Sequence, residues 1–233
     1  MTVPGDLYFN KQSGKQSFQQ FNQYKQLTTI NEVHTYSYPV MEHFYTLQGE
    51  GAHTGRAAYF IRLAGCDVGC VWCDVKESWD AEGHPLLTTD AIVAAASQHP
   101  GRIAVITGGE PAMHDLRPLC DALHAAGFRT HIETSGSGPL TGALDWITLS
   151  PKKFKAPLDA SLQRANELKV IVYNKSDFKW AEEHAAKVPE HCILYLQPEW
   201  SKRDQVTPLI IDYIQQNPRW QLSLQTHKYL NIP

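Results

Sequence analysis

Three of the five cysteines lie within eight residues, with the spacing Cys66-x3-Cys70-x2-Cys73. This spacing constrains the fold, because three thiols in one short loop must bend round a common centre. Gly65 and Gly69 give the loop the backbone freedom to do so. An odd number of cysteines is a poor disulfide framework, and in a reducing compartment such a group indicates metal binding or catalysis.

Thiolates bind iron–sulfur clusters and zinc alike. A structural zinc site normally has four protein ligands. No second CxxC or HxxxH follows the cysteine loop, and His53 or His84 would serve only if the fold brought them close. Three cysteines without a fourth leave one iron of a 4Fe-4S cluster open, where the amino and carboxylate groups of S-adenosylmethionine can chelate it. A zinc-binding protein without catalysis is the alternative. Cys120 and Cys192 lie far from the loop, and we predict that both are core thiols.

The hydrophobic pattern from residue 36 onward predicts strands that alternate with helices. The predicted strands are 57–63, 103–107, 129–134, 145–149, 168–173, 192–196 and 220–225. The predicted helices are 88–98 with Thr88 or Thr89 as N-cap, 115–126 closed by Gly127, 158–166, 176–187 capped by Ser176, and 203–216 interrupted by Pro208. This alternation indicates an α/β fold with a mostly parallel sheet. A closed eightfold barrel takes roughly 250 residues, so residues 36–233 with about seven strands favour a partial, open TIM-like βα barrel.

Most of the unusual polar and glycine-rich segments come directly after a predicted strand. AGC follows the first strand, TGGEP the second, ETSG the third and SPK the fourth, and QPEW and QTHK follow later ones. Since parallel strands end at one edge of the sheet, we expect the site there. The glycines of TGGEP let backbone approach a ligand closely, and Glu110 adds an acceptor that suits an ammonium group.

Composition sets the remaining expectations. Residues 1–35, rich in Gln, Lys and Ser without a clear period, are expected to form an N-terminal extension, flexible or draped on a single catalytic domain at 36–233. A net charge of −3 and a pI near 6.4 predict no nucleic-acid surface and no basic membrane patch. No apolar run approaches the roughly 20 residues of a membrane span, and no signal peptide is visible. A cytoplasmic protein is therefore expected.

Four segments resemble the 7-carboxy-7-deazaguanine synthase family of the radical S-adenosylmethionine (radical SAM) superfamily. They are FYTLQGEGAHTG (44–55), FIRLAGCDVGCVWCD (60–74), VITGGEP (105–111) and QTHKYLNIP (225–233). ETSG, SPK and LQP also match, and the resemblance runs from about residue 38 to the last residue. LQGEG and THKYLNI are its most diagnostic parts. Another radical SAM enzyme, of the glycyl-radical activating type, would share the cysteine loop and GGEP but not that last segment.

The resemblance implies a reaction. A reduced 4Fe-4S cluster cleaves S-adenosylmethionine, and the 5′-deoxyadenosyl radical takes a hydrogen from C6 of 6-carboxy-5,6,7,8-tetrahydropterin. The ring contracts, ammonia leaves and 7-carboxy-7-deazaguanine forms, in queuosine or other 7-deazapurine biosynthesis. The 5′-deoxyadenosine returns the radical, so S-adenosylmethionine is a catalytic cofactor. The family also implies a homodimer and an electron donor such as flavodoxin or ferredoxin.

The resemblance also implies which residues form the site. The cluster ligands would be Cys66, Cys70 and Cys73. The S-adenosylmethionine site would comprise Trp72, Cys73, Asp74, Gly108, Gly109, Glu110, Ser150, Pro151, Lys152, Gln197, Pro198, Glu199 and Trp200. The substrate would be bound by Leu47, Gln48, Gly49, Glu50, Arg62, Thr107, His227 and Pro233, with Arg62 as the bidentate partner of its carboxylate.

One position departs from the family pattern. After the third cysteine the family has Cys-Asp-Thr, and the threonine helps to hold a magnesium ion beside the substrate carboxylate. Here the sequence is Cys73-Asp74-Val75, and valine offers no oxygen, the ligand atom that magnesium needs. The ion would bind with one protein ligand fewer, would be held by Asp74 or a backbone carbonyl, or would be absent.

Overall fold

The computed structural model describes residues 36–233 and has one nine-stranded sheet, in the order β3-β1-β2-β4-β5-β6-β7-β8-β9. The strands are β1 (Ser37–Leu47), β2 (Ala57–Leu63), β3 (Leu86–Thr88), β4 (Ile103–Gly108), β5 (Arg129–Thr134), β6 (Trp146–Leu149), β7 (Glu167–Val172), β8 (Ile193–Pro198) and β9 (Trp220–Leu222). β1 pairs antiparallel with β2 and β3, and every pair from β2 to β9 is parallel. The sheet is open, as predicted for a partial barrel. The predicted extension 1–35 lies outside the described residues.

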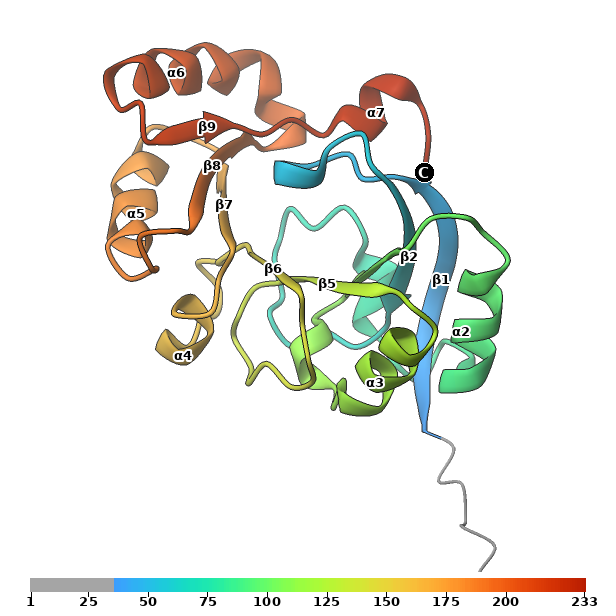
Figure 1. The fold of residues 1–233 in the computed structure, drawn as a ribbon. Helices are drawn as coiled ribbons and strands as arrows, with labels where there is room; N and C mark the ends of the chain where they lie inside the picture. The colour runs from blue at the N-terminus through green and yellow to red at the C-terminus, as the bar shows by residue number, and fades with distance from the viewer. Residues whose placement is uncertain (1–35) are drawn as a thin grey trace, which may run out of the picture. The chain divides into compact units, whose positions relative to one another are not determined.

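The longer helices lie on the outside of the curved sheet (Figure 1). The α-helices are α2 (Thr89–Ser97), α3 (Arg117–Ala125), α4 (Asp159–Leu162), α5 (Ser176–Ala185), α6 (Arg203–Gln216) and α7 (Thr226–Leu230). Short 3-10 turns are η1 (Gly51–His53), η2 (Lys76–Trp79), η3 (Pro111–Met113) and η4 (Trp200–Lys202). None of the helices within 36–233 combines the length and the apolar character that crossing a membrane requires.

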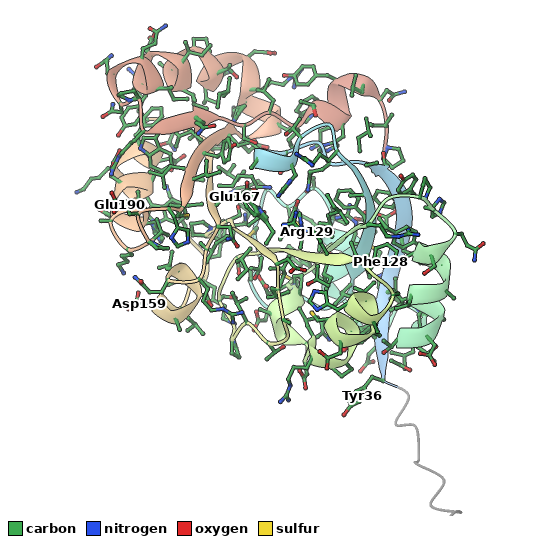
Figure 2. All side chains as sticks on the ribbon, viewed as in Figure 1. Tyr36, Phe128, Arg129, Asp159, Glu167 and Glu190 are labelled. Atoms are coloured by element: carbon green, nitrogen blue, oxygen red, sulfur yellow. The ribbon has the colours of Figure 1, made fainter. Side chains whose placement is uncertain are left out.

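Strand β7 shows how the two faces of the sheet differ. Leu168, Val170 and Val172 are fully buried in the apolar cluster that packs the sheet against α5 and α6. The alternating residues Glu167 and Lys169 belong to the opposite face, because successive strand side chains point to opposite sides. They are nevertheless 3% and 4% exposed, and Glu167 lies toward the interior of the molecule in Figure 2. The inner face of the sheet therefore carries buried polar groups.

The structure confirms the strands at 57–63 and 129–134 and the order of the other predicted elements. It corrects the helix predicted at 176–187, because Lys175 is the N-cap and Ser176 is the first helical residue. The Ser176 hydroxyl donates to Asn174 Oδ1 at 2.6 Å, so it is not available to cap the helix. Gly127, with φ +81°, follows α3 as predicted, and Thr88 caps α2 by accepting from the Ala91 N–H.

Two further elements differ from the prediction in extent, and a third differs in continuity. The helix predicted at 158–166 is one turn, Asp159–Leu162, and the strand predicted at 220–225 ends at Leu222. Helix α6 continues through Pro208 without interruption. An internal proline costs about 3 kcal/mol, and burial of Val206 and Ile210 on one face of α6 offsets that cost.

The sequence prediction missed β1, β3 and α7. Strand β1 has a register irregularity between Val40 and Glu42, and this shift breaks the alternation by which a strand is detected. Strand β3 has three residues and α7 has five. Elements this short are fixed by tertiary contacts rather than by their own pattern.

Candidate active site

A cavity of about 370 Å³ lies at the carboxyl ends of the parallel strands, within the size range of small-molecule sites. It is lined by nearly every residue that the sequence placed in the site. These are Leu47, Gln48, Gly49, Glu50, Arg62, Cys66, Cys70, Trp72, Cys73, Asp74, Val75, Thr107, Gly108, Gly109, Glu110, Ser150, Lys152, Gln197, Pro198, Glu199, Trp200, His227 and Pro233. Pro151 is the exception: it is buried and does not line the cavity.

The cysteine loop places three thiols on one wall of the cavity. Gly65 and Gly69 have φ of +102° and +69°, which confirms that the loop uses conformations that favour glycine. Cys66, Cys70 and Cys73 are free thiols, and burial raises the pKa of Cys70 to about 11. Three thiols that face one cavity fit a 4Fe-4S cluster with one open iron. Metal binding must displace the protons of these thiols, since thiolates are the ligands.

Within residues 36–233, no three His, Cys, Asp or Glu side chains are grouped as ligands of a single metal ion. The cysteine prediction concerns a cluster, whose thiolates bind separate iron atoms, and so this finding does not bear on it. Cys120 and Cys192 are 0% and 7% exposed, and both belong to the apolar clusters, as predicted.

The Gly-Gly-Glu turn after β4 packs directly on the cysteine loop. Glu110 N–H donates to the Gly65 carbonyl at 2.8 Å, and Gly109 N–H donates to the Leu63 carbonyl at 2.9 Å. A Cβ added at Gly109 would lie 2.3 Å from the Gly65 oxygen, and Gly108 has φ +128°. Side chains are therefore excluded at both glycines, and the turn presents bare backbone to the cavity.

Glu110 ties this turn to the loop that follows β5. Its side chain is buried, and its two oxygens accept from the N–H of Ala112 at 3.0 Å and from the N–H of Ser135 at 2.8 Å. The hydroxyls of Thr134 and Ser135 donate to the same carboxylate. Four donors fill the usual acceptor sites of a carboxylate. Glu110 thus holds the two loops of the cavity wall together. An ammonium group of a ligand would share the Glu110 carboxylate with these donors.

The floor of the cavity is the segment Leu47-Gln48-Gly49-Glu50, which is fastened to the inner face of the sheet. Gln48 Nε2 donates to Glu133 Oε1 at 2.9 Å, and Gln225 Nε2 donates to Glu50 Oε1 at 2.9 Å. Lys169 Nζ donates to the other oxygen of Glu50. Glu133, Lys169 and Gln225 were not among the site residues predicted from the sequence. The signal for Lys169 was a charged residue within the predicted strand 168–173, whose neighbours Leu168 and Val170 are apolar.

Gly49 and His227 are packed against each other. A Cβ at Gly49 would lie 2.2 Å from His227 Nδ1, so only glycine allows this approach. The Thr226 N–H and hydroxyl both donate to the Gly49 carbonyl at 2.9 Å, which fixes α7 over the floor segment. Burial lowers the pKa of His227, although the Glu50 carboxylate opposes this effect. The imidazole is therefore neutral at neutral pH.

Arg62 and Thr107 lie side by side on the neighbouring strands β2 and β4. Arg62 Nε donates to Glu42 Oε1 at 2.6 Å, which orients the guanidinium. This contact leaves the two Nη nitrogens as donors for a bidentate acid group.

Other residues that line the cavity carry polar groups that suit S-adenosylmethionine. Lys152 Nζ donates to Ser150 Oγ at 2.6 Å and lies 5.5 Å from the centre of the Trp72 ring. Burial lowers the pKa of Lys152, and the nearby Lys169 adds to that effect. Gln197 is buried on β8, and its Oε1 accepts from Ser223 Oγ at 2.7 Å. Together with the bare Gly-Gly backbone, these donors and acceptors fit the amino-acid and ribose groups of that cofactor.

The residues near Val75 do not fit a magnesium ion. Val75 lines the cavity and has no oxygen on its side chain. The neighbouring Asp74 pairs with Lys228, with 2.9 Å between Lys228 Nζ and Asp74 Oδ2. Magnesium takes oxygen ligands, usually one or two carboxylates besides water, and here the carboxylate of the adjacent Asp74 already faces an ammonium group.

Gly49→Ala tests the packing of the floor against His227. The added Cβ must displace the imidazole, so we expect about 10- to 100-fold weaker binding of pterin-6-carboxylate, an unreactive relative of the expected substrate. Fluorescence titration measures this affinity. Gly83→Ala is the matched control, because a Cβ at Gly83 has no neighbour closer than 3.4 Å. Equal affinity in both variants would contradict the packing described for Gly49.

Comparison with known proteins identifies the family. The family model described as "Radical SAM superfamily" matches residues 60–172. The 7-carboxy-7-deazaguanine synthase of Flavobacterium psychrophilum is 60% identical over 195 residues, which cover 84% of this chain and 92% of that protein. The enzyme of the same name from Synechocystis sp. is 52% identical over 203 residues, covering 87% and 97%.

A solved structure agrees with these sequence relatives. The crystal structure of QueE from Escherichia coli matches with a TM-score of 0.75 at 37% identity, and the match covers 82% of this chain and 95% of that one. The chain therefore belongs to the 7-carboxy-7-deazaguanine synthase family of the radical SAM superfamily.

Proposed function

We propose that this protein is a 7-carboxy-7-deazaguanine synthase, a radical SAM carbon–nitrogen lyase. Its substrate is 6-carboxy-5,6,7,8-tetrahydropterin, and it forms 7-carboxy-7-deazaguanine and ammonia for queuosine or other 7-deazapurine biosynthesis. One observation carries the proposal. The cysteine loop, the Gly-Gly-Glu turn, the Leu47–Glu50 floor and the last residues of the chain are far apart in sequence and line one cavity.

The residues divide into two groups around this cavity. Cys66, Cys70 and Cys73 hold the 4Fe-4S cluster, and the walls formed by Gly109, Ser150 and Lys152 receive S-adenosylmethionine. When bound, the cluster and S-adenosylmethionine supply homolytic carbon–sulfur cleavage and hydrogen abstraction. The protein's own part is to orient the reactants, and the close-packed turn after β4, where Gly108 and Gly109 leave no room for side chains, contributes to this.

The substrate lies between Arg62 and the floor. The two Nη nitrogens of Arg62 bind its carboxylate, beside the hydroxyl of Thr107. Gln48 and Glu50 face the amino group and ring nitrogens of the heterocycle. Neutral His227, packed on Gly49, can accept a proton from the ring and return it when ammonia leaves.

Three further features belong to the same proposal. The electron donor is a small redox protein such as flavodoxin or ferredoxin, and the exposed Val71 in the cysteine loop leaves the loop open to its approach. The protein acts as a homodimer, as the family resemblance implies. It works in the cytoplasm, where a reducing environment keeps the cluster thiols free.

Anaerobic turnover tests the function. Protein with a reconstituted cluster is given reductant, S-adenosylmethionine and 6-carboxytetrahydropterin, and mass spectrometry should detect 7-carboxy-7-deazaguanine. Cys70→Ser should lose cluster and product, whereas Cys192→Ser, in the core, should keep both. Cleavage of S-adenosylmethionine to 5′-deoxyadenosine without product would refute the substrate and favour another radical SAM reaction. No cleavage by protein with an intact cluster would refute the whole proposal.

Val75 leads to a second expectation, because we propose that turnover proceeds without magnesium. A magnesium titration from chelator-treated buffer should leave kcat and KM unchanged. Val75→Thr restores a hydroxyl beside Asp74 and should make turnover respond to magnesium, whereas Val75→Ala should not. A several-fold activation of the unaltered protein by magnesium would count against the proposal.

A further inference from the structure

Lys169 is the most completely enclosed of the cationic side chains that line the cavity. It lies in the middle of β7, and its side chain is 5% exposed. Its Nζ donates to Glu50 and lies 3.8 Å from Glu133 Oε2. A buried lysine is costly unless carboxylates surround it, and this one joins the floor segment to strand β5. Neither the proposed reaction nor the sequence motifs assign it a part.

We propose that Lys169 is a positioning residue that keeps Glu50 ionised and thereby makes the cavity specific for a heterocycle with two adjacent N–H donors on one edge. The 2-amino-4-oxo ring of a pterin has such an edge, formed by N3–H and the 2-amino group. The inference rests on the proposed function, because Glu50 is the residue proposed to face that ring.

The hydrogen bonds of Glu50 leave room for such an edge. A carboxylate has about four acceptor sites. Gln225 uses one on Oε1, and Lys169 uses one on Oε2. About two remain, one on each oxygen, and both can only accept as long as Glu50 is ionised. A protonated Glu50 would offer one donor and one acceptor instead, which matches a 2-oxo ring rather than a 2-amino ring.

The groups around Glu50 decide whether its side chain is ionised or protonated. Burial disfavours its ionisation, but the Lys169 ammonium and the hydrogen bonds from Lys169 and Gln225 outweigh burial and hold the pKa of Glu50 well below its ordinary value. Glu133 on β5 and Glu167 on β7 also face Lys169. Lys152 and His227 are the other titratable groups nearby.

Removal of the Lys169 ammonium would leave Glu50 buried beside other carboxylates. Both burial and like charges favour the protonated form, so its pKa would rise above the ordinary range. Recognition of a 2-amino edge would then be lost at low pH and would return as the pH rises and Glu50 ionises.

A pair of unreactive ligands can measure this change in ring preference. Pterin-6-carboxylate has the 2-amino edge, and lumazine-6-carboxylate has a 2-oxo group in its place. Binding of each to the anaerobic holoenzyme with S-adenosylmethionine is measured by fluorescence at pH 6. The unaltered protein should prefer the pterin by about 100-fold. Glu50→Gln offers one donor and one acceptor and should reverse the preference, and Lys169→Met should reverse it in the same direction.

Two controls separate this role from a structural one. Lys169→Arg keeps the charge and should retain the pterin preference, whereas Lys187→Met removes an exposed lysine and should change nothing. With the tetrahydropterin substrate, the ratio of the KM of Lys169→Met to that of the unaltered protein should fall by up to about tenfold per pH unit between pH 6 and 9. A lysine that only stabilises the fold would not alter the choice between two ligands.

The outcomes distinguish the inference from the proposed function. If the unaltered protein binds neither probe, both are overturned. If it prefers the pterin and Lys169→Met keeps that preference, the inference alone is wrong. If Lys169→Met does not fold, Lys169→Gln takes its place: a reversed preference at pH 6 would support the inference, and a retained pterin preference, or equal affinity of the unaltered protein for the two probes, would overturn it.

Discussion

The buried contact between Lys169 and Glu50 is the interaction on which the cavity depends. Burial of either charge alone would cost several kcal/mol, so each residue requires the other. The pair also joins two distant parts of the chain, because Glu50 follows β1 and Lys169 lies on β7. The floor segment is thereby held inside an open barrel whose outer face is packed by apolar clusters. The inner face can carry these buried polar groups because Lys169 faces carboxylates and because Glu50 and Glu167 accept hydrogen bonds.

Close contacts at two glycines hold the other segments around the cavity in place. Gly109 lets the turn after β4 pack on the cysteine loop, and Gly49 lets the floor pack on His227. Glu110 then ties the turn to the loop after β5 through four donors. In each case a side chain is either absent, so that backbone can approach, or fully hydrogen-bonded. Such rigidity suits an enzyme whose cofactors supply the reactive chemistry and whose protein must fix their geometry.

Much of the site could be predicted from the sequence because its parts are local motifs. The cysteine spacing, the Gly-Gly-Glu turn and the Leu47–Glu50 segment each lie in consecutive residues. The first two follow parallel strands, whose carboxyl ends meet at one edge of the sheet, whereas Leu47–Glu50 follows the antiparallel β1 and was assigned to the site only through the family resemblance. The place of Lys169 in the site could not be predicted, because it depends on contact with Glu50, which lies far away in the sequence. The extent of α4 and the interruption of α6 at Pro208 were predicted wrongly for a related reason, since tertiary packing rather than local propensity decided them.

Label transfer tests the central claim most directly, namely that the substrate bound in this cavity loses a hydrogen from C6 to the cofactor bound there. The protein is given 6-carboxytetrahydropterin with deuterium at C6, and S-adenosylmethionine is recovered after turnover and analysed by mass spectrometry. This account predicts deuterium in the recovered S-adenosylmethionine, since the hydrogen taken from C6 passes to the 5′ carbon and the cofactor is regenerated. Formation of product with no deuterium in the recovered cofactor would contradict it.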